Sequence, residues 1–207
     1  MIESNTQHIK YGSRILIASH NKAKIREMKT MMAPYNIRVI SSADLDLPEP
    51  EETGDSFNAN AEIKAVAAAK ASGMISLADD SGFCVNALKG APGIYSARWA
   101  GPNKDYKAAM ERIREELGHN KDWSAWFFCA LCVVWPDGTI RSFDGRVDGE
   151  FVWPPRGKNG HGYDPVFKAT GSSLTFGEMT DAEKNEISHR ARAFNSFYKN
   201  CLLSSPA

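Results

Sequence analysis

The chain has 207 residues, 43% of them hydrophobic, which suits one or two domains with a sizeable core. Basic and acidic residues number 25 each, so the formal net charge is zero. This balance argues against nucleic-acid binding, which needs a basic excess, but it allows a small phosphorylated ligand held by a local cluster of cations. No apolar run is long enough to cross a bilayer, and the N-terminus lacks the apolar core of a signal peptide, so we expect no membrane partner.

The four cysteines, Cys84, Cys129, Cys132 and Cys201, are expected to be reduced and structural. Cys129 and Cys132 have the CxxC spacing of some zinc and redox sites. They lie in an apolar stretch that is typical of a buried strand, where positions three apart face opposite sides. No second pair of ligands follows along the chain. Reduced cysteines are typical of the cytoplasm, which is the predicted location.

Residues 1–13 are expected to form a loosely ordered leader, followed by a single α/β domain over residues 14–207. A β-branched run at 14–18 predicts a strand, and apolar residues at helical spacing over 25–32 predict a helix. Between them, residues 19–24 supply a hydroxyl group, an amide and two lysines where a helix N-terminus has free N–H groups. Two interpretations stay open: an anion site, or a capped and solvated helix start.

An acidic, proline-containing stretch at residues 47–56 precedes a predicted helix that runs to about residue 72. Asn60 and Lys64 are one turn apart in this helix and therefore share a face. The acidic run is typical of a solvated loop that caps a helix. A metal role for Glu51 or Glu52 is the alternative.

Residues 78–82, Ala-Asp-Asp-Ser-Gly, follow a short apolar run and predict a strand that ends in a tight turn. The adjacent carboxylates of Asp79 and Asp80 repel each other, so they require a metal ion, a basic partner or a shared proton. We interpret this stretch as the acid centre of a metal-assisted hydrolytic site. The alternative is a surface turn, because Asp, Ser and Gly are common in turns.

The second half of the chain alternates extended and helical patterns. The predicted elements are an ordered loop, rather than a helix, at 88–99, a helix at about 103–117, a hairpin of strands at 124–135 and 139–147, a glycine-rich aromatic loop at 154–165, and a helix at about 181–203. Together with the acids, the basic residues near 22, 184 and 190 make up what a nucleoside triphosphate hydrolase needs. Cations bind phosphate, carboxylates bind Mg²⁺ and activate water, and a ring contacts the base.

Six short motifs follow one another in an order that is specific as a set, although each alone is weak. They are residues 19–24; 52–54 with Asn60-Ala61 and 63–65; 78–82; 90–98; 160–165; and 183–185 with 188–190. In these motifs the chain resembles the noncanonical purine nucleoside triphosphate pyrophosphatases, the inosine/xanthosine triphosphatases or Ham1-like family. The resemblance covers roughly residues 14 to 195 and favours the catalytic interpretation of residues 78–82 over the surface turn.

The resemblance implies an elongated α/β fold, with a mixed β-sheet in two lobes flanked by helices and the active site in the cleft between the lobes. It implies a homodimer that hydrolyses ITP, dITP and XTP to the monophosphate and pyrophosphate with Mg²⁺, which cleanses the nucleotide pool. By matching position, Asp80 is the general base and, with Glu52, a metal ligand, and we expect Mg²⁺ to lower the pKa of Asp80. The implied substrate-binding residues are Ser19, His20, Asn21, Lys22, Ala23, Lys24, Ser81, His161, Gly162, Tyr163, Asp164, Lys184, His189 and Arg190.

Residues 161–164 are expected to line the base pocket, and the other implied substrate-binding residues largely to hold phosphates. His161 stands where the family generally has phenylalanine, and an imidazole is a smaller ring that can become protonated. Asn86 stands where the family commonly has aspartate, so one negative charge near the acids is missing and the resemblance does not define the full set of metal ligands. Two other functions stay open: a pyrophosphatase for other modified nucleotides, and a non-catalytic nucleotide-binding module.

Overall fold

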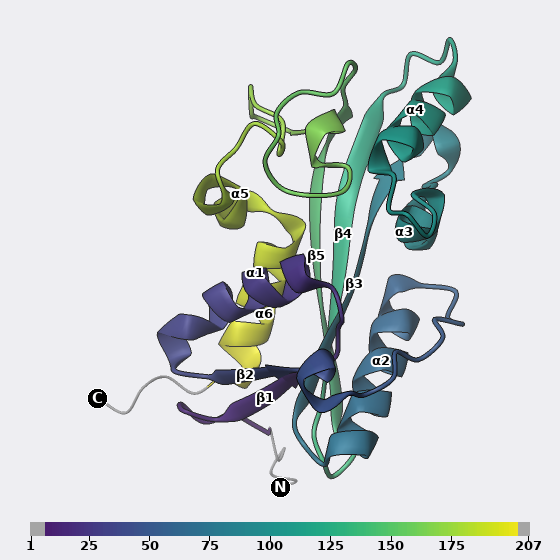
Figure 1. Cartoon of the computed structure of the whole chain (residues 1–207). Coiled ribbons are helices and arrows are strands. Elements are labelled where there is room, and N and C mark those ends of the chain that lie inside the picture. The colour runs from purple at the N-terminus through teal and green to yellow at the C-terminus, as the bar shows by residue number, and fades with distance from the viewer. Residues whose placement is uncertain (1–6, 203–207) are drawn as a thin grey trace, which may run out of the picture. The chain divides into compact units, whose positions relative to one another are not determined.

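A computed structural model describes residues 7–202, which form an α/β fold around a six-stranded sheet in the order β2-β1-β3-β4-β5-β6 (Figure 1). Strand β1 pairs in parallel with β2 and β3, whereas β5 and β6 are antiparallel, so the sheet is mixed. This confirms the predicted α/β class with a mixed sheet. The strands are β1 (Arg14–Ile17), β2 (Arg38–Ser41), β3 (Ser76–Val85), β4 (Ser124–Val134), β5 (Ile140–Phe151) and β6 (Phe167–Ala169).

The helices begin where a polar side chain can accept hydrogen bonds from the first free N–H groups. Such caps precede four of them: Asn21, Ser56, Asp105 and Thr180. Across residues 7–202, no helix has both the length and the apolar composition to cross a membrane. The helices are α1 (Lys22–Met32), α2 (Phe57–Ser72), α3 (Ser96–Trp99), α4 (Tyr106–Leu117), α5 (Asp181–Ile187) and α6 (His189–Cys201).

The described chain divides into two compact units, each assembled from separate segments. The first contains the described residues up to Asp80, Ala130–Asp144 and the described residues from Ala193 onward. The second contains Ser81–Cys129 and Gly145–Arg192. Sequence composition predicted one domain without an internal boundary, and it marks none because three of the boundaries fall inside strands β3, β4 and β5. The cleft expected between two lobes stays a prediction.

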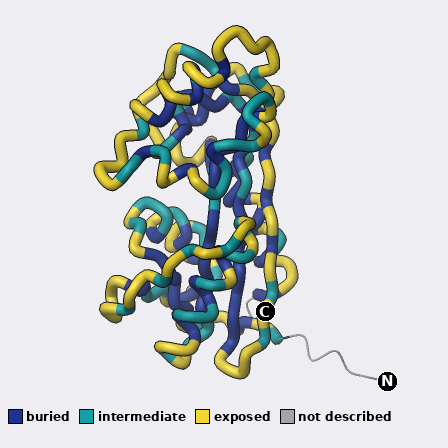
Figure 2. Tube along the Cα trace, turned by 90° about the vertical axis from the view of Figure 1, so that its right-hand side faces the viewer, coloured by how far each residue is buried: buried dark blue, intermediate teal, exposed yellow. Residues whose placement is uncertain are grey.

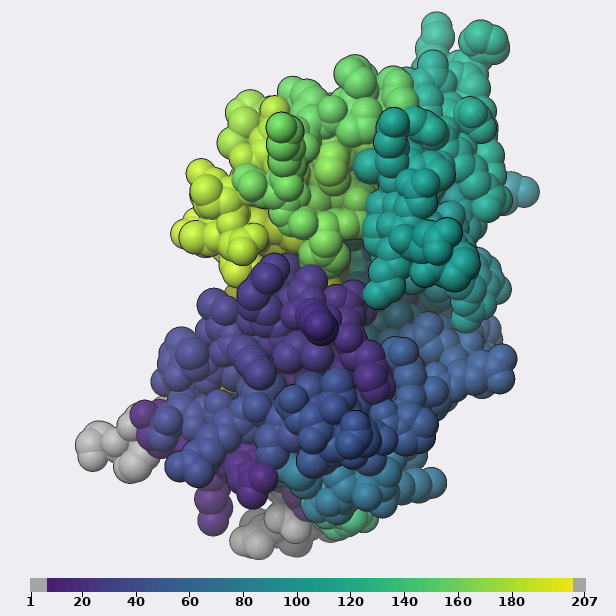
Figure 3. All heavy atoms as spheres, in the orientation of Figure 1, coloured from purple at the N-terminus to yellow at the C-terminus, as the bar shows by residue number. Residues whose placement is uncertain are grey.

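The first unit packs helices on both sides of its strands. In Figure 1, α2 lies on one side of β3, and α1 and α6 lie on the other. Strand β1 is fully buried at Ile15, Leu16 and Ile17, so it reads as a continuous apolar run rather than an alternating one. The face of this unit seen in Figure 3 is formed mostly by its N-terminal segment, drawn in purple to blue.

The second unit has an aromatic core. The ring of Phe83 on β3 lies 5.1 Å from that of Phe127, 5.3 Å from that of Tyr163 and 5.9 Å from that of Phe167, measured between centroids. These rings are at most 7% exposed. Figure 2 shows burial along the chain: buried positions are concentrated in the interior and exposed positions in the outer loops.

Three local predictions are wrong. Residues 78–82 do not form a turn but lie inside β3, which continues for ten residues to Val85. The last helix is interrupted at Ser188, whose ψ of 159° is extended, so that α5 and α6 are separate. The stretch at 88–99 was predicted to be a loop rather than a helix, but it contains the short helix α3. The leader at residues 1–13 stays a prediction; within it, Ile9 is 1% exposed and its N–H donates to the Cys201 carbonyl at 2.7 Å. Residues 1–6 of that leader lie outside the described residues.

All four cysteines are free and buried, as the structural interpretation predicted. Burial raises the pKa of the Cys84 thiol to about 12, and burial also raises the pKa values of Cys132 and Cys201 to about 11. Cys129 and Cys132 both lie in β4, three positions apart. A thiol that is neutral and inaccessible is a poor nucleophile.

We therefore expect none of the four thiols to react with Ellman's reagent at pH 8 in the native protein, because burial blocks access and disfavours the thiolate. Four thiols per chain should react once guanidinium unfolds the protein. Absorbance at the thionitrobenzoate band measures both values. A thiol that reacts rapidly in the native protein would contradict the burial described here.

Candidate active site

Asp79 and Asp80 are buried side by side in β3, and their side chains point to opposite faces of the strand because successive residues alternate. On one face, Oδ2 of Asp79 lies 3.0 Å from Nζ of Lys24 in α1. On the other face, Oδ1 of Asp80 lies 3.5 Å from Nζ of Lys64 in α2. The repulsion between the two carboxylates is thus offset by one ammonium group on each face.

Helix α2 holds Asp80 through two residues one turn apart, Asn60 and Lys64, which are 0% and 6% exposed. Asn60 donates from Nδ2 to Oδ2 of Asp80 at 3.3 Å, so each oxygen of this carboxylate faces one residue of α2. The face of α2 that carries them is otherwise made of small buried residues such as Ala61, Ala65 and Ala68. Alanines allow the helix to approach the strand closely.

The same two residues hold the acidic loop that precedes α2. Oδ1 of Asn60 accepts the N–H of Gly54 at 2.8 Å, and Nζ of Lys64 lies 2.5 Å from Oε1 of Glu52. A Cβ atom at Gly54 would lie 2.7 Å from Oδ1 of Asn60, which is too close for any other residue. Asn60 and Lys64 therefore bring Glu52 and Asp80 together, although 28 positions separate them along the chain.

The electrostatics of this cluster follow from burial. Burial raises the pKa of the Asp80 carboxyl above its ordinary value, and the charges of Lys64 and Lys24 only partly oppose the shift. Burial lowers the pKa of Lys64, but the charges of Asp80, Asp79 and Glu52 outweigh it and raise the pKa. Lys64 is therefore an ammonium ion at neutral pH. The lower Asp80 pKa expected beside Mg²⁺ concerns the metal-bound state and stays a prediction.

The carboxylates of Glu52 and Asp80 fit a small divalent cation. They come from different elements and both approach one positive charge, the ammonium of Lys64. Within residues 7–202 there is no group of three or more His, Cys, Asp or Glu side chains placed to hold a metal by themselves. Mg²⁺ does not need such a cage, because it is commonly bound by one or two carboxylates together with substrate phosphates and water.

The loop at residues 19–24 forms a capped start of α1. Oδ1 of Asn21 accepts the N–H groups of Ala23 and Lys24 at 3.0 and 3.4 Å, and the N–H of Asn21 donates to Oγ of Ser19. Lys22 is exposed and Ala23 is half-buried. The structure therefore shows the capping interpretation, and an anion site at the same helix end stays a prediction.

His20 in this loop contacts the acidic loop. Its Nε2 lies 3.0 Å from the Leu47 carbonyl, and its Nδ1 lies 3.9 Å from Glu49. A cavity of about 100 Å³ within the first unit is lined by residues that include His20, Leu47 and Lys64. The imidazole is thus placed to hold the loop that carries Glu52.

In the second unit, Lys184 and Asp164 form a buried ion pair. Nζ of Lys184 lies 2.7 Å from Oδ2 of Asp164, and the two side chains are 4% and 3% exposed. The same oxygen accepts the N–H of His161 at 2.7 Å. A Cβ atom at Gly160, whose φ is +72°, would lie 2.1 Å from it. The pair therefore fixes the loop at residues 160–164.

Tyr163 anchors the same loop in the core. Its side chain is 2% exposed, and its hydroxyl donates to the Ser96 carbonyl at 2.9 Å. Oγ of Ser96 in turn accepts the N–H of Phe83 at 2.9 Å. Since the Tyr163 ring is enclosed, His161 and Gly162 are the half-buried members of the predicted base-binding loop.

The remaining predicted basic residues begin α6. His189 is 4% exposed, and its ring stacks on that of Phe127 with centroids 4.7 Å apart. Arg190 is 2% exposed and donates from one guanidinium nitrogen to Oγ of Ser81 at 3.5 Å. The structure thus brings Ser81 and Arg190 together, and it places both basic residues in the interior rather than on a solvated helix face.

Sequence reasoning missed the roles of Asn60, Lys64 and Asp79. Asn60 and Lys64 were seen to share a helix face, and that face is the signal that could have paired them with the acids. Asn86, the second departure from the family pattern, donates from Nδ2 to Oδ2 of Asp122 at 2.6 Å and lies in the second unit. Its side chain is thereby committed to an exposed loop.

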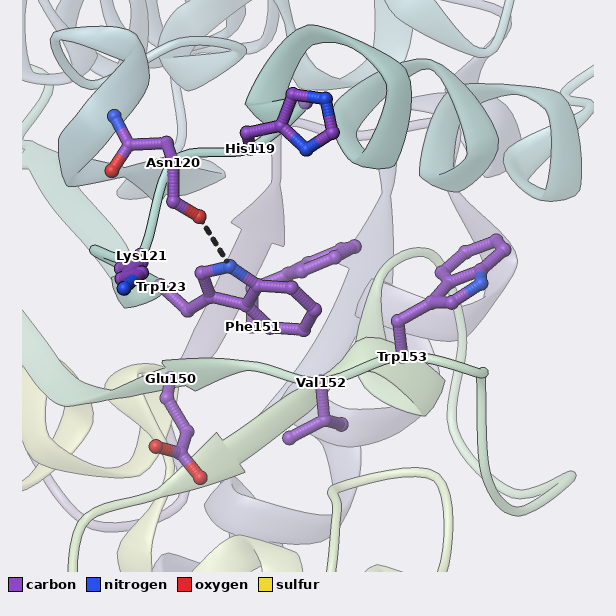
Figure 4. A pocket seen from close by; sticks show the side chains of 9 residues that line it. His119, Asn120, Lys121, Trp123, Glu150, Phe151, Val152 and Trp153 are labelled. Carbon is purple, nitrogen blue, oxygen red and sulfur yellow. Dashed lines mark hydrogen bonds between the residues drawn. The ribbon is translucent and has the colours of Figure 1, made fainter.

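A larger depression of about 650 Å³ lies on the second unit (Figure 4). None of the predicted site residues lines it. Its wall includes Trp123, whose indole N–H donates to the Asn120 carbonyl at 2.9 Å, and Trp153. We assign the chemistry to the carboxylate cluster instead, because hydrolysis needs a base and a metal site rather than volume alone.

The Ham1 family model matches residues 15–200 of the chain. The chain is 58% identical over 194 residues to the dITP/XTP pyrophosphatase of Gluconobacter oxydans, covering 94% of this chain and 93% of that protein. It is 49% identical over 192 residues to the dITP/XTP pyrophosphatase of Zymomonas mobilis, covering 91% of this chain and 92% of that protein.

Solved structures give the same result. The Ham1 protein of Staphylococcus aureus superposes with a TM-score of 0.82 at 40% identity, covering 90% of this chain and 96% of that one. A HAM1 protein from Coxiella burnetii superposes with a TM-score of 0.84 at 37% identity, again covering 90% and 96%. The predicted resemblance is therefore confirmed over most of the chain.

We expect Lys184→Met to lower the free energy of unfolding by about 3–5 kcal/mol, because Asp164 is left as a buried carboxylate without its ammonium. Adding Asp164→Asn should recover part of this loss. Urea denaturation measures each variant. Lys107→Met is the matched control, since the Lys107–Glu111 pair lies on the surface and should change stability by less than about 1 kcal/mol. An equal loss in both single variants would contradict the importance of the buried pair.

Proposed function

The chain belongs to the Ham1 family, and we propose that it hydrolyses the noncanonical purine nucleoside triphosphates ITP, dITP and XTP to the monophosphate and pyrophosphate. Such an activity removes damaged purine nucleotides from the nucleotide pool. The observation that carries the proposal is that Glu52 and Asp80 both approach one positive charge in the first unit, the ammonium of Lys64. Two carboxylates that converge on one point of positive charge are also the arrangement that binds the metal ion in metal-assisted phosphoryl chemistry.

We propose that Glu52 and Asp80 hold Mg²⁺ through their carboxylate oxygens. When bound, the ion neutralises phosphate charge and favours ionisation of a nearby water. The protein contributes the fixed positions of the two acids, which Asn60 and Lys64 set through the contacts at Gly54, Glu52 and Asp80. Fixed ligands reduce the reorganisation needed at the moment of reaction.

Asp80 is the general base in this proposal, and one of its carboxylate oxygens takes a proton from the water that attacks the α-phosphorus. The hydrogen bond from Asn60 fixes the plane of the carboxylate. The raised pKa of Asp80 makes it a stronger base than an ordinary aspartate as long as it stays ionised. Asp79 acts indirectly, because its ion pair with Lys24 holds the start of α1 against β3.

The substrate-binding roles rest on matching positions in the family motifs. The loop at residues 19–24, Ser81, His189 and Arg190 are assigned to the substrate, largely to its phosphates. Lys184 has a second role in addition to binding substrate: its ion pair with Asp164 fixes the loop at residues 160–164. Positive groups that are already ordered stabilise a pyrophosphate leaving group without an added entropic cost.

Base recognition is assigned to the loop at residues 160–164, with His161 and Gly162 as its accessible members. Discrimination against ATP follows if the pocket donates to a 6-oxo group and accepts from the ring N–H. The adenine amine would then leave buried partners unpaired, a penalty that can reach several orders of magnitude in specificity. The anchor from Tyr163 to the Ser96 carbonyl keeps the loop in place for this task.

Assembly as a homodimer and location in the cytoplasm are further parts of the proposal. Both follow from the family resemblance, and the four free cysteines fit a reducing compartment. Sedimentation equilibrium of the purified chain tests the assembly. A mass of one chain at micromolar concentration would contradict the dimer.

Asp80→Asn should lower kcat for ITP by at least about a hundredfold, because the amide cannot accept the proton of the attacking water. Binding of an ITP analogue should persist, as fluorescence titration would show. Asp144→Asn is the control: Asp144 is an exposed residue of β5 that accepts a hydrogen bond from Asn58, and its variant should keep full activity. Turnover by the Asp80 variant at the control rate would contradict the role of Asp80.

A panel of ITP, dITP, XTP, GTP, ATP and dUTP, assayed for pyrophosphate release, tests the substrate class. We expect ITP, dITP and XTP to be favoured, and EDTA to abolish release until Mg²⁺ is restored in excess. Preference for ATP or dUTP would favour a pyrophosphatase for other nucleotides. Nucleotide binding without any release would favour a binding module.

A further inference from the structure

Lys64 lies where two acidic side chains meet. It is 6% exposed, and its Nζ lies 2.5 Å from Oε1 of Glu52 and 3.5 Å from Oδ1 of Asp80. These are the carboxylates to which the proposed function gives the metal ion. One ammonium group therefore contacts both proposed ligands of a divalent cation.

The charges of the cluster show why the ammonium is needed there. Lys24 contacts Asp79 on the opposite face of β3, whereas Lys64 contacts both Glu52 and Asp80. A buried carboxylate without a nearby positive charge carries a large desolvation cost. In the absence of a metal, Lys64 provides positive charge beside both the buried Asp80 and the half-buried Glu52, which lowers the cost of placing the two acids near each other.

We propose that Lys64 is a built-in counter-ion that a divalent cation must displace from Glu52 and Asp80. This inference rests on the proposed function, since it takes the two acids to be the metal ligands. A cation that binds both acids must push the ammonium aside, and repulsion between the two positive charges adds to that cost. Lys64 therefore weakens binding of the metal alone.

The displaced ammonium requires a new anion, because Lys64 is buried and an unpaired charge in a buried region is costly. A triphosphate that arrives with its own metal ion supplies that anion, whereas the free metal ion does not. The cost of moving Lys64 is then met only when metal and nucleotide arrive together. Lys64 thus couples occupation of the metal site to the presence of substrate.

Asn60 offers a contrast on the same helix face. It is neutral, and it holds Gly54 and Asp80 by hydrogen bonds at 2.8 and 3.3 Å. Removing it should loosen both proposed ligands and weaken metal binding. Removing the charge of Lys64 should do the reverse, so two neighbouring substitutions should move metal affinity in opposite directions.

The experiment is a titration of the full chain with Mn²⁺ in the absence of nucleotide. The electron paramagnetic resonance signal of the free ion measures the dissociation constant. We expect Lys64→Met to bind Mn²⁺ at least about tenfold more tightly than the wild type, because a positive charge has been removed beside the site. Lys64→Arg keeps the charge and should stay within about threefold of the wild type. Asn60→Ala should bind more weakly. Equal or weaker binding by Lys64→Met would overturn the proposal.

A second measurement covers the case in which Lys64→Met folds poorly without metal. Wild-type protein labelled with ¹⁵N-lysine gives an Nζ signal for a buried ammonium, which Lys64→Arg identifies by its loss. We expect this signal to move when Mg²⁺ and a non-hydrolysable ITP analogue are added together, and to move little with Mg²⁺ alone at the same concentration. An unchanged signal in the complex would overturn the proposal.

The two hypotheses fail in different ways. Pyrophosphate release from ITP by the wild type, with no gain in Mn²⁺ affinity for Lys64→Met, would leave the proposed function standing and remove the role of Lys64. Tighter Mn²⁺ binding by that variant, with no release from any triphosphate, would support the counter-ion and remove the proposed function.

Discussion

Two adjacent aspartates buried in one strand constrain the first unit. Their carboxylates cannot share a face of β3, because successive side chains alternate, so each needs its own cation from a different helix. Lys24 of α1 and Lys64 of α2 meet this need on the two sides. The packing of both helices against β3 therefore depends on charge balance as well as on apolar burial. Replacing either lysine would leave a buried carboxylate of β3 without its ammonium.

The second unit solves a similar problem in another way. Lys184 and Asp164 neutralise each other at 2.7 Å, and the carboxylate uses the same oxygen to hold the backbone of His161. A buried pair of this kind adds little net stability over an apolar pair, but losing one partner is costly. Its value here is positional, because it holds the backbone of a glycine-rich loop at His161.

Much of the site was readable from residue types and their order. Six motifs identified the family, and the strand, loop and helix pattern of residues 14–32 was predicted correctly, including the start of the helix that Asn21 caps. The predictions that are wrong concern continuity. Asp, Ser and Gly at 79–82 predicted a turn because they are common in turns, but the cations of α1 and α2 allow the strand to continue through them. The helix break at Ser188 was not predicted, although serine is a favoured residue at a helix start and Oγ of Ser188 accepts the Ala191 N–H.

The acid stretch at residues 78–82, the helix that carries Asn60 and Lys64, and the glycine of the acidic loop can all be found in the sequence by itself, together with the family and its chemistry. What the tertiary structure alone decided is which charges meet. Glu52 and Asp80 are far apart along the chain, and Asn60 and Lys64 join them only because one face of α2 packs against β3 and the acidic loop. Sequence patterns report local preferences, whereas the partner of a buried charge is set by packing between distant segments, since burial makes an uncompensated charge too costly to keep.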